Sequence, residues 1–199
     1  SFQFVNGTSD TSQSPYVVFS SEQEFTISLT ASNINGVDTE TKYKYLAIGG
    51  YHIPFMESWE DSLAIEQWNV VNTDNNKSWN IATVGGTTPG NTAIKMAHYG
   101  YNAPGEIDEI WSPSLNLKNL SNASLTFDYA YRRYSANRSD SLKVYISTDC
   151  GSTWNFLAGY GEDGTGNYAT GTINQTSNFT PSTSADWCGG SNASCKVIS

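Results

Sequence analysis

Residues 147–154, Ser-Thr-Asp-Cys-Gly-Ser-Thr-Trp, are the stretch from which the fold of this chain can be read. The residues before them, 142–146, are Leu-Lys-Val-Tyr-Ile, and those after them, 155–157, are Asn-Phe-Leu. Runs of this kind on both sides of a polar, Gly-containing stretch predict two strands joined by a hairpin tip. Asp149 can accept hydrogen bonds from backbone N–H groups of the turn, and Gly151 can adopt a positive φ without a Cβ clash.

The pattern S-x-D-x-G-x-T-W resembles the Asp-box of sialidase-like propellers and other secreted β proteins. This resemblance implies that the motif is structural. Asp149 is therefore predicted to hold the turn rather than to catalyse a reaction, and Gly151 to allow it. Trp154 is expected to pack beneath the loop.

The composition favours an all-β protein and excludes some classes of partner. The 199 residues suggest one or two domains, and 38% hydrophobic and 13% aromatic residues suffice for packed cores. Ten basic against 19 acidic side chains give a formal charge of −9, which argues against nucleic acid and is compatible with cations such as Ca²⁺. No apolar run approaches the roughly 18 residues that a membrane span requires.

The first 48 residues predict several short strands. Phe25, Ile27 and Leu29 alternate with polar residues and should share one face of a strand. The pieces F-x-F, S-P-Y-V-V-F, E-F-T-I-S-L-T-A-S-N and G-V-D-T-E-T-K, in this order, resemble the C-terminal half of a PKD (polycystic kidney disease) domain, an immunoglobulin-like sandwich. The resemblance implies a partial Ig-like module over residues 1–48.

Residues 49–52 are predicted to be a linker, followed by a second block over 53–199. Its pieces F-M-E-S-W-E, W-S-P-S-L-N-L, S-L-T-F-D-Y-A-Y and D-S-L-K-V-Y-I-S-T-D-C-G-S-T-W resemble the MAM-like jelly-roll domains of secreted Bacteroidetes proteins, also called cleaved-adhesin or choice-of-anchor domains. The resemblance implies a jelly-roll β-sandwich. Members of that family continue with further strands, so we expect this chain to be a fragment at both ends.

The long segment Ala123–Tyr131 alternates and predicts a strand with Leu125, Phe127, Tyr129 and Tyr131 on one face. Further tyrosines are expected near loops, where their rings could stack on sugars. The stronger expectation is that such rings pack while their hydroxyls stay wet. The tyrosines considered for this role are Tyr99, Tyr101, Tyr131, Tyr134, Tyr160 and Tyr168.

The three cysteines include one candidate pair. Cys188 and Cys195 bracket a short Gly/Ser/Asn loop, which makes a local disulfide plausible. Cys150 lies at the hairpin tip and is expected to be free or to pair outside this chain.

Catalytic motifs are missing from the sequence. The two histidines, His52 and His98, form no H-E-x-x-H motif, and there is no G-x-S-x-G. This chain is therefore predicted not to be an enzyme. A jelly-roll glycosidase is the alternative, with Glu57, Glu60, Glu106, Asp108 and Glu109 as its acidic candidates. The preferred interpretation of residues 106–109 is a solvated loop.

Calcium is the better use of the acidic side chains, since it prefers clustered oxygen ligands. In MAM-like jelly rolls an acidic residue of the first strand and one from the loop before the Asp-box strand often hold a structural Ca²⁺. By this resemblance Glu57 and Asp140 are the predicted ligands, with Asp128 as a weaker third. The alternative is that Asp128 bonds to a neighbouring strand and Asp140 caps a turn.

A PKD module followed by a MAM-like domain resembles the C-terminal half of a secreted zinc metallopeptidase, and similar pairs occur in surface adhesins. The expected function is a non-catalytic accessory or cell-adhesion region of a secreted or cell-surface protein. It would position a substrate or bind a protein or glycan surface. A Ca²⁺-dependent carbohydrate-binding module is the runner-up.

Overall fold

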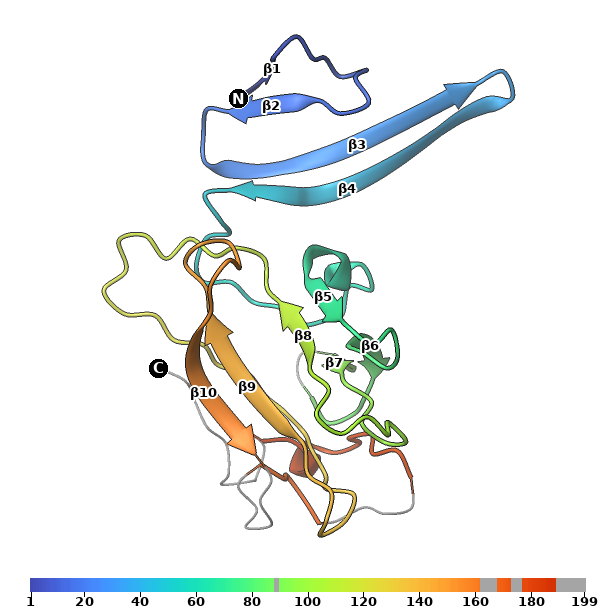
Figure 1. The fold of residues 1–199 in the computed structure, drawn as a ribbon, viewed down its shortest axis with the longest axis vertical. Coiled ribbons are helices and arrows are strands. Elements are labelled where there is room, and N and C mark those ends of the chain that lie inside the picture. The colour runs from blue at the N-terminus through green and yellow to red at the C-terminus, as the bar shows by residue number, and fades with distance from the viewer. Residues whose placement is uncertain (88–89, 162–167, 173–176, 189–199) are drawn as a thin grey trace. The chain divides into compact units, whose positions relative to one another are not determined.

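The computed structural model describes residues 1–87, 90–161, 168–172 and 177–188, and it is built almost entirely from β-strands (Figure 1). The strands are β1 (Phe2–Val5), β2 (Tyr16–Phe19), β3 (Gln23–Asn33), β4 (Gly36–Ile48), β5 (Asn69–Asn72), β6 (Asn80–Thr83), β7 (Thr92–Lys95), β8 (Asp108–Trp111), β9 (Ser141–Ile146) and β10 (Asn155–Gly161). Two single 3₁₀ turns, η1 (Ala64–Gln67) and η2 (Ser184–Asp186), complete the assignment. The predicted all-β class is confirmed. Over the described ranges no helix is long and apolar enough to cross a membrane.

The strands pair in twos, and every pair is antiparallel. The pairs are β1–β2, β3–β4, β5–β8, β6–β7 and β9–β10. The β5–β8 pair joins segments about 40 residues apart, and its register places Asn72 opposite Asp108. Side chains directly opposite each other in such a pair lie on the same face of the sheet, so these two polar residues are neighbours.

The chain forms two compact units. The first contains residues 1–56 and 113–119, and the second contains residues 57–112 and 120–199. Residues 113–119 belong to the first unit because Tyr51 bridges to Leu115: its N–H donates to the Ser114 carbonyl at 2.7 Å, and its carbonyl accepts from the Asn116 N–H at 2.8 Å. The predicted linker, residues 49–52, lies inside this first unit.

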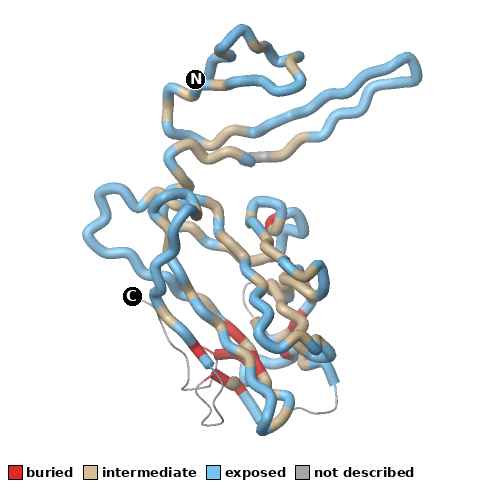
Figure 2. Tube along the Cα trace, viewed as in Figure 1, coloured by how far each residue is buried: buried red, intermediate tan, exposed pale blue. Residues whose placement is uncertain are grey.

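The first unit is held by an aromatic cluster at one end of its strands. The Phe19 and Phe25 rings lie 4.5 Å apart, and the Phe2 ring contacts both at 6.3 Å. Beyond this cluster the β3–β4 hairpin is open to solvent: Leu29 is 71% exposed and Ile34, at its tip, is 99% exposed (Figure 2). Among residues whose burial is described, none in this unit is fully buried.

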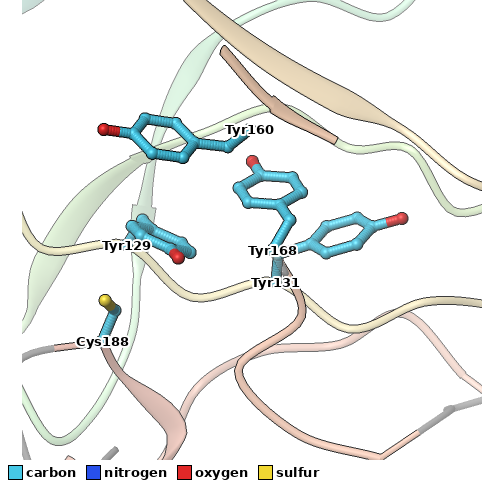
Figure 3. Packing of buried hydrophobic residues seen from close by; sticks show 5 residues of the cluster. All are labelled: Tyr129, Tyr131, Tyr160, Tyr168 and Cys188. Carbon is cyan, nitrogen blue, oxygen red and sulfur yellow. The ribbon is translucent and has the colours of Figure 1, made fainter. Parts of the chain in front are cut away.

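The core of the second unit is made of tyrosines. Its buried residues are Tyr129, Tyr131, Tyr160, Tyr168 and Cys188 (Figure 3). The Tyr131 and Tyr168 rings stack at 4.5 Å, and the Tyr129 and Tyr160 rings stack at 6.2 Å. Tyrosine rings bury a large apolar area and carry a hydroxyl that needs a partner. The Tyr131 hydroxyl has one, Asp140, whereas the Tyr129 hydroxyl is buried without a hydrogen-bond partner among the described residues.

The strand predicted over Ala123–Tyr131 is wrong, because no strand is assigned there. Three of the four residues predicted to share one face do pack in the core. Tyr129 and Tyr131 are buried and Phe127 packs against their cluster, while Leu125 is 47% exposed. Among the described residues of this segment, only Leu125 forms an isolated bridge. The Cys188 N–H donates to the Tyr129 carbonyl, and the Thr170 N–H donates to the Tyr131 carbonyl, both at 2.8 Å.

Asp186 holds residues 181–187 in place through hydrogen bonds and an ion pair. Its carboxylate accepts from the N–H groups of Ser182 at 2.9 Å and Thr183 at 3.0 Å, and it pairs with the Arg132 guanidinium. The Ser182 N–H bond is the main cause that lowers the pKa of Asp186 to about 2. The Gly85 N–H donates to the Pro181 carbonyl at 2.8 Å, which brings this segment against the chain before residue 87.

Candidate functional site

The turn between β9 and β10 is organised by the Asp149 carboxylate. Its Oδ1 atom accepts from the Ser147 hydroxyl and the Thr153 N–H, both at 2.8 Å, and its Oδ2 atom accepts from the Thr153 hydroxyl at 2.6 Å. The Ser147 hydroxyl in turn accepts from the Gly151 N–H at 2.8 Å. These bonds, that of the Thr153 hydroxyl foremost, lower the pKa of Asp149 to about 2, so the carboxylate stays charged and serves the turn.

Two residues of this turn adopt a positive φ, Cys150 at 57° and Gly151 at 84°. A Cβ atom on Gly151 would lie 2.9 Å from the Trp111 ring. Trp111 therefore lies against the turn, the place expected for Trp154, and the Trp154 ring packs on Trp111 at 4.9 Å with 39% of its area exposed. The local sequence does not point to Trp111, because this residue is far from the hairpin along the chain.

The depressed pKa makes the turn sensitive to acid. A carboxyl whose folded pKa lies below its unfolded value of about 3.8 stabilises the fold above that pH, and this contribution is lost as the pH falls towards 2. We expect Asp149→Asn to lower the urea midpoint at pH 7 and to approach the wild type below pH 3. Urea unfolding followed from pH 2 to 7 measures this, and a difference that does not change with pH would contradict it.

The residues predicted to bind calcium have protein partners in the structure. Glu57 Oε1 accepts from the Trp59 N–H at 2.9 Å. Asp140 Oδ2 accepts from the Tyr131 hydroxyl at 3.0 Å, and its Oδ1 lies 3.4 Å from His98 Nδ1. Asp128 is exposed. Within the described ranges no three His, Cys, Asp or Glu side chains form a group that could hold a metal ion. Calcium binding at these positions stays a prediction.

The acidic residues considered for glycoside hydrolysis are placed differently from the expectation. Glu60 Oε1 accepts from the N–H groups of Asn91 at 2.9 Å and Thr92 at 2.8 Å, and the bond from the Thr92 hydroxyl is the main cause that lowers its pKa. Asp108 and Glu109 lie in β8, so the predicted solvated loop is wrong for them. The reason is the distant partner strand β5, which the local sequence does not reveal.

Five of the six loop tyrosines divide into two groups, and the sixth, Tyr101, is half-buried. Tyr131, Tyr160 and Tyr168 are core residues, so an exposed role is wrong for them. Tyr99 and Tyr134 are 41% and 46% exposed, and their rings meet edge to face at 5.9 Å. This pair is the part of the predicted aromatic surface that the structure leaves open to solvent.

The cysteines and His52 complete the sequence-predicted set. Cys150 is a free, exposed thiol at the tip of the β9–β10 hairpin. Cys188 is disulfide-bonded, and its predicted partner, Cys195, lies outside the described residues. His52 is exposed in the first unit.

The outward face of β9–β10 carries a second pair of exposed rings. β9 alternates between half-buried and exposed positions, and Tyr145 is on the exposed face, 44% exposed. It is directly opposite Phe156 of β10, which is 59% exposed, and the two rings meet edge to face at 5.6 Å. We call Tyr145 and Phe156 the hairpin aromatic pair.

Comparison with known proteins gives no relative: no family model, no curated protein and no solved structure matches this chain.

Proposed function

We propose that this chain is a non-catalytic accessory or adhesion region of a secreted or cell-surface protein, and that it binds a protein surface. The observation that carries the proposal is the hairpin aromatic pair. Exposed aromatic rings that lie on a regular sheet are typical of binding interfaces, because they offer large contact area at low cost in side-chain entropy.

The hairpin aromatic pair is held in place by its own strands. Tyr145 and Phe156 are cross-strand neighbours, and such pairs stabilise the sheet while presenting both rings to one side. Gly159 lies beneath Phe156: a Cβ atom there would be 3.2 Å from the Phe156 ring. The absence of a side chain at residue 159 therefore leaves room for the ring against β10. A ring fixed in this way loses little freedom when a partner covers it.

The use of the acidic side chains supports a binding role over a hydrolytic one. Asp149, Glu60 and Asp186 each accept hydrogen bonds that fix loops, and these bonds lower all three pKa values. The largest contribution comes from a threonine hydroxyl for Asp149 and Glu60, and from the Ser182 N–H for Asp186. A general acid needs the opposite environment, one that raises its pKa towards neutral. These carboxylates are arranged for structure. The resemblance to accessory regions of secreted zinc metallopeptidases and to adhesins agrees with this use.

Binding by the hairpin pair can be tested on immobilised extracellular proteins. We expect the chain to bind at least one of fibronectin, collagen and mucin saturably, and Phe156→Ser to weaken that binding at least fivefold. Leu63→Ser is the matched control, because Leu63 is 60% exposed in the same unit but lies outside the pair. Biosensor titration measures both. No binding to any of these proteins, or equal losses in both variants, would contradict the proposal.

Tyr99 and Tyr134 favour carbohydrate binding as a second candidate function. Their exposed rings form an edge-to-face pair, and Lys77 Nζ donates to the Tyr99 carbonyl at 2.5 Å, which fixes the backbone at that ring. Exposed rings of this kind can stack on the apolar faces of sugars. A glycan array would distinguish the two candidates: glycan binding lost in Tyr134→Ala but kept in Phe156→Ser favours this one.

A further inference from the structure

One end of the β5–β8 pair gathers side-chain oxygens that lack partners. Asn72 and Asp108 are directly opposite each other there. Asn72 Oδ1, Asp108 Oδ1 and Ser78 Oγ are all buried, and none has a hydrogen-bond partner within the described part of the chain. Buried polar atoms are nearly always satisfied in folded proteins, so three such oxygens on half-buried residues call for a partner that the protein does not supply, a bound cation or water.

A second carboxylate joins this group through Tyr101. The Tyr101 hydroxyl lies 2.8 Å from Asp74 Oδ2 and 3.3 Å from Asp108 Oδ2, so these two oxygens are within about 6 Å of each other. The hydroxyl has one proton and can satisfy only one of them. Two carboxylates thus lie close to one hydroxyl, and neither of these hydrogen bonds involves a cationic side chain.

The turn between β5 and β6 is held by side-chain hydrogen bonds. The Asn76 N–H donates to Asp74 Oδ1 at 2.9 Å, and Asn72 Nδ2 donates to the Asn76 carbonyl at 3.1 Å, which leaves Asn72 Oδ1 available. Asn75 supplies the positive φ of 56° that closes the turn. Trp79 Nε1 donates to the Asp108 carbonyl at 3.0 Å and ties the far end of the turn to the same strand.

We propose that Asp74, Asp108 and Asn72 form a calcium site, with the Ser78 hydroxyl as a further oxygen ligand. Calcium takes six to eight oxygens from carboxylates, amide carbonyls and water in flexible geometry, and this set offers two carboxylates and an amide. Magnesium is disfavoured because it demands a near-ideal octahedron and keeps most of its water. The site is separate from the sequence-predicted positions Glu57, Asp140 and Asp128, and it does not depend on the proposed binding function.

The test uses the full 199-residue chain, stripped of metal with EDTA and titrated with CaCl₂ by calorimetry. Terbium luminescence excited through tryptophan gives a second readout, since Trp79 is bonded to Asp108. We expect a site whose calcium affinity falls at least tenfold in Asp108→Asn and in Asp74→Asn. The matched controls Asp140→Asn and Glu57→Gln remove the same charge elsewhere in the chain and should leave the affinity of this site unchanged.

A gain-of-function variant covers the case in which Asp108→Asn fails to fold. Asn72→Asp adds a third carboxylate, so it should raise the calcium affinity severalfold if residue 72 supplies a ligand. Circular dichroism establishes that each variant is folded. The site is refuted if the wild type binds no calcium at several millimolar, above the range of about 10⁻³ M seen for weak extracellular modules. It is also refuted if Asn72→Asp leaves the affinity unchanged, or if the controls lose binding and Asp108→Asn does not.

Discussion

Replacing Tyr131 by alanine is expected to lower the free energy of unfolding by about 3–5 kcal/mol, the cost typical of removing a large buried aromatic side chain. The ring stacks on Tyr168 at 4.5 Å and is 7% exposed, so its removal opens a cavity at the centre of the second unit. Domains have about 5–15 kcal/mol of stability in total, and this loss takes a large share of it.

Tyr131→Phe separates packing from hydrogen bonding. The Tyr131 hydroxyl donates to Asp140 Oδ2 at 3.0 Å and accepts from the Asp140 N–H at 3.1 Å. Losing these bonds while keeping the ring should cost about 1–2 kcal/mol. Guanidinium unfolding followed by near-UV circular dichroism measures both variants. A loss below about 1 kcal/mol for Tyr131→Ala would show that the tyrosine cluster does not hold the unit together.

Gly86→Ala is expected to cost about 3–5 kcal/mol, because overpacking and an unfavourable backbone conformation act together. Gly86 has φ at 75°, and a Cβ atom there would overlap the Thr183 carbonyl carbon. The methyl group must displace residues 181–187. The indole N–H of Trp187 donates to the Gly85 carbonyl at 2.7 Å, so this hydrogen bond must be disturbed as well.

The matched control for this variant is Gly105→Ala. Gly105 also has a positive φ, 91°, but a Cβ atom there would have no contact within 4 Å among the described residues beyond its chain neighbours. Gly105→Ala should therefore lower the free energy of unfolding by only about 1 kcal/mol, the cost of the backbone conformation alone. Thermal unfolding of both variants gives the comparison, and equal losses would show that residues 181–187 are not packed on Gly86.

Features encoded by neighbouring residues can be predicted from the sequence. The β9–β10 hairpin is expected over residues 142–157 and is found over 141–161, because the strands flank a turn whose Asp149 and Gly151 are both local. The inward alternation of Phe127, Tyr129 and Tyr131 is likewise visible, since side-chain period depends only on an extended backbone.

Features that depend on distant partners cannot be predicted in this way. The β5–β8 pair brings Asn72 to Asp108, and nothing near residue 108 indicates this neighbour. The unpartnered oxygens at that pair become visible only with the fold. The Trp111 ring at Gly151 is a similar case, and so is the segment 123–131, which hydrogen-bonds to the distant residues Thr170 and Cys188.

A core made of tyrosine side chains makes folding stability depend on pH in alkaline solution, whereas a core of leucines would not. Burial raises the pKa of Tyr129 and of Tyr168, whereas the unfolded chain releases the same protons near pH 10. Above that pH the unfolded state gains from ionisation and the packed rings do not, so the stability that these groups contribute in neutral solution declines as the medium becomes more basic. The protein should therefore lose stability in strongly alkaline solution because its second unit is packed with tyrosine rings.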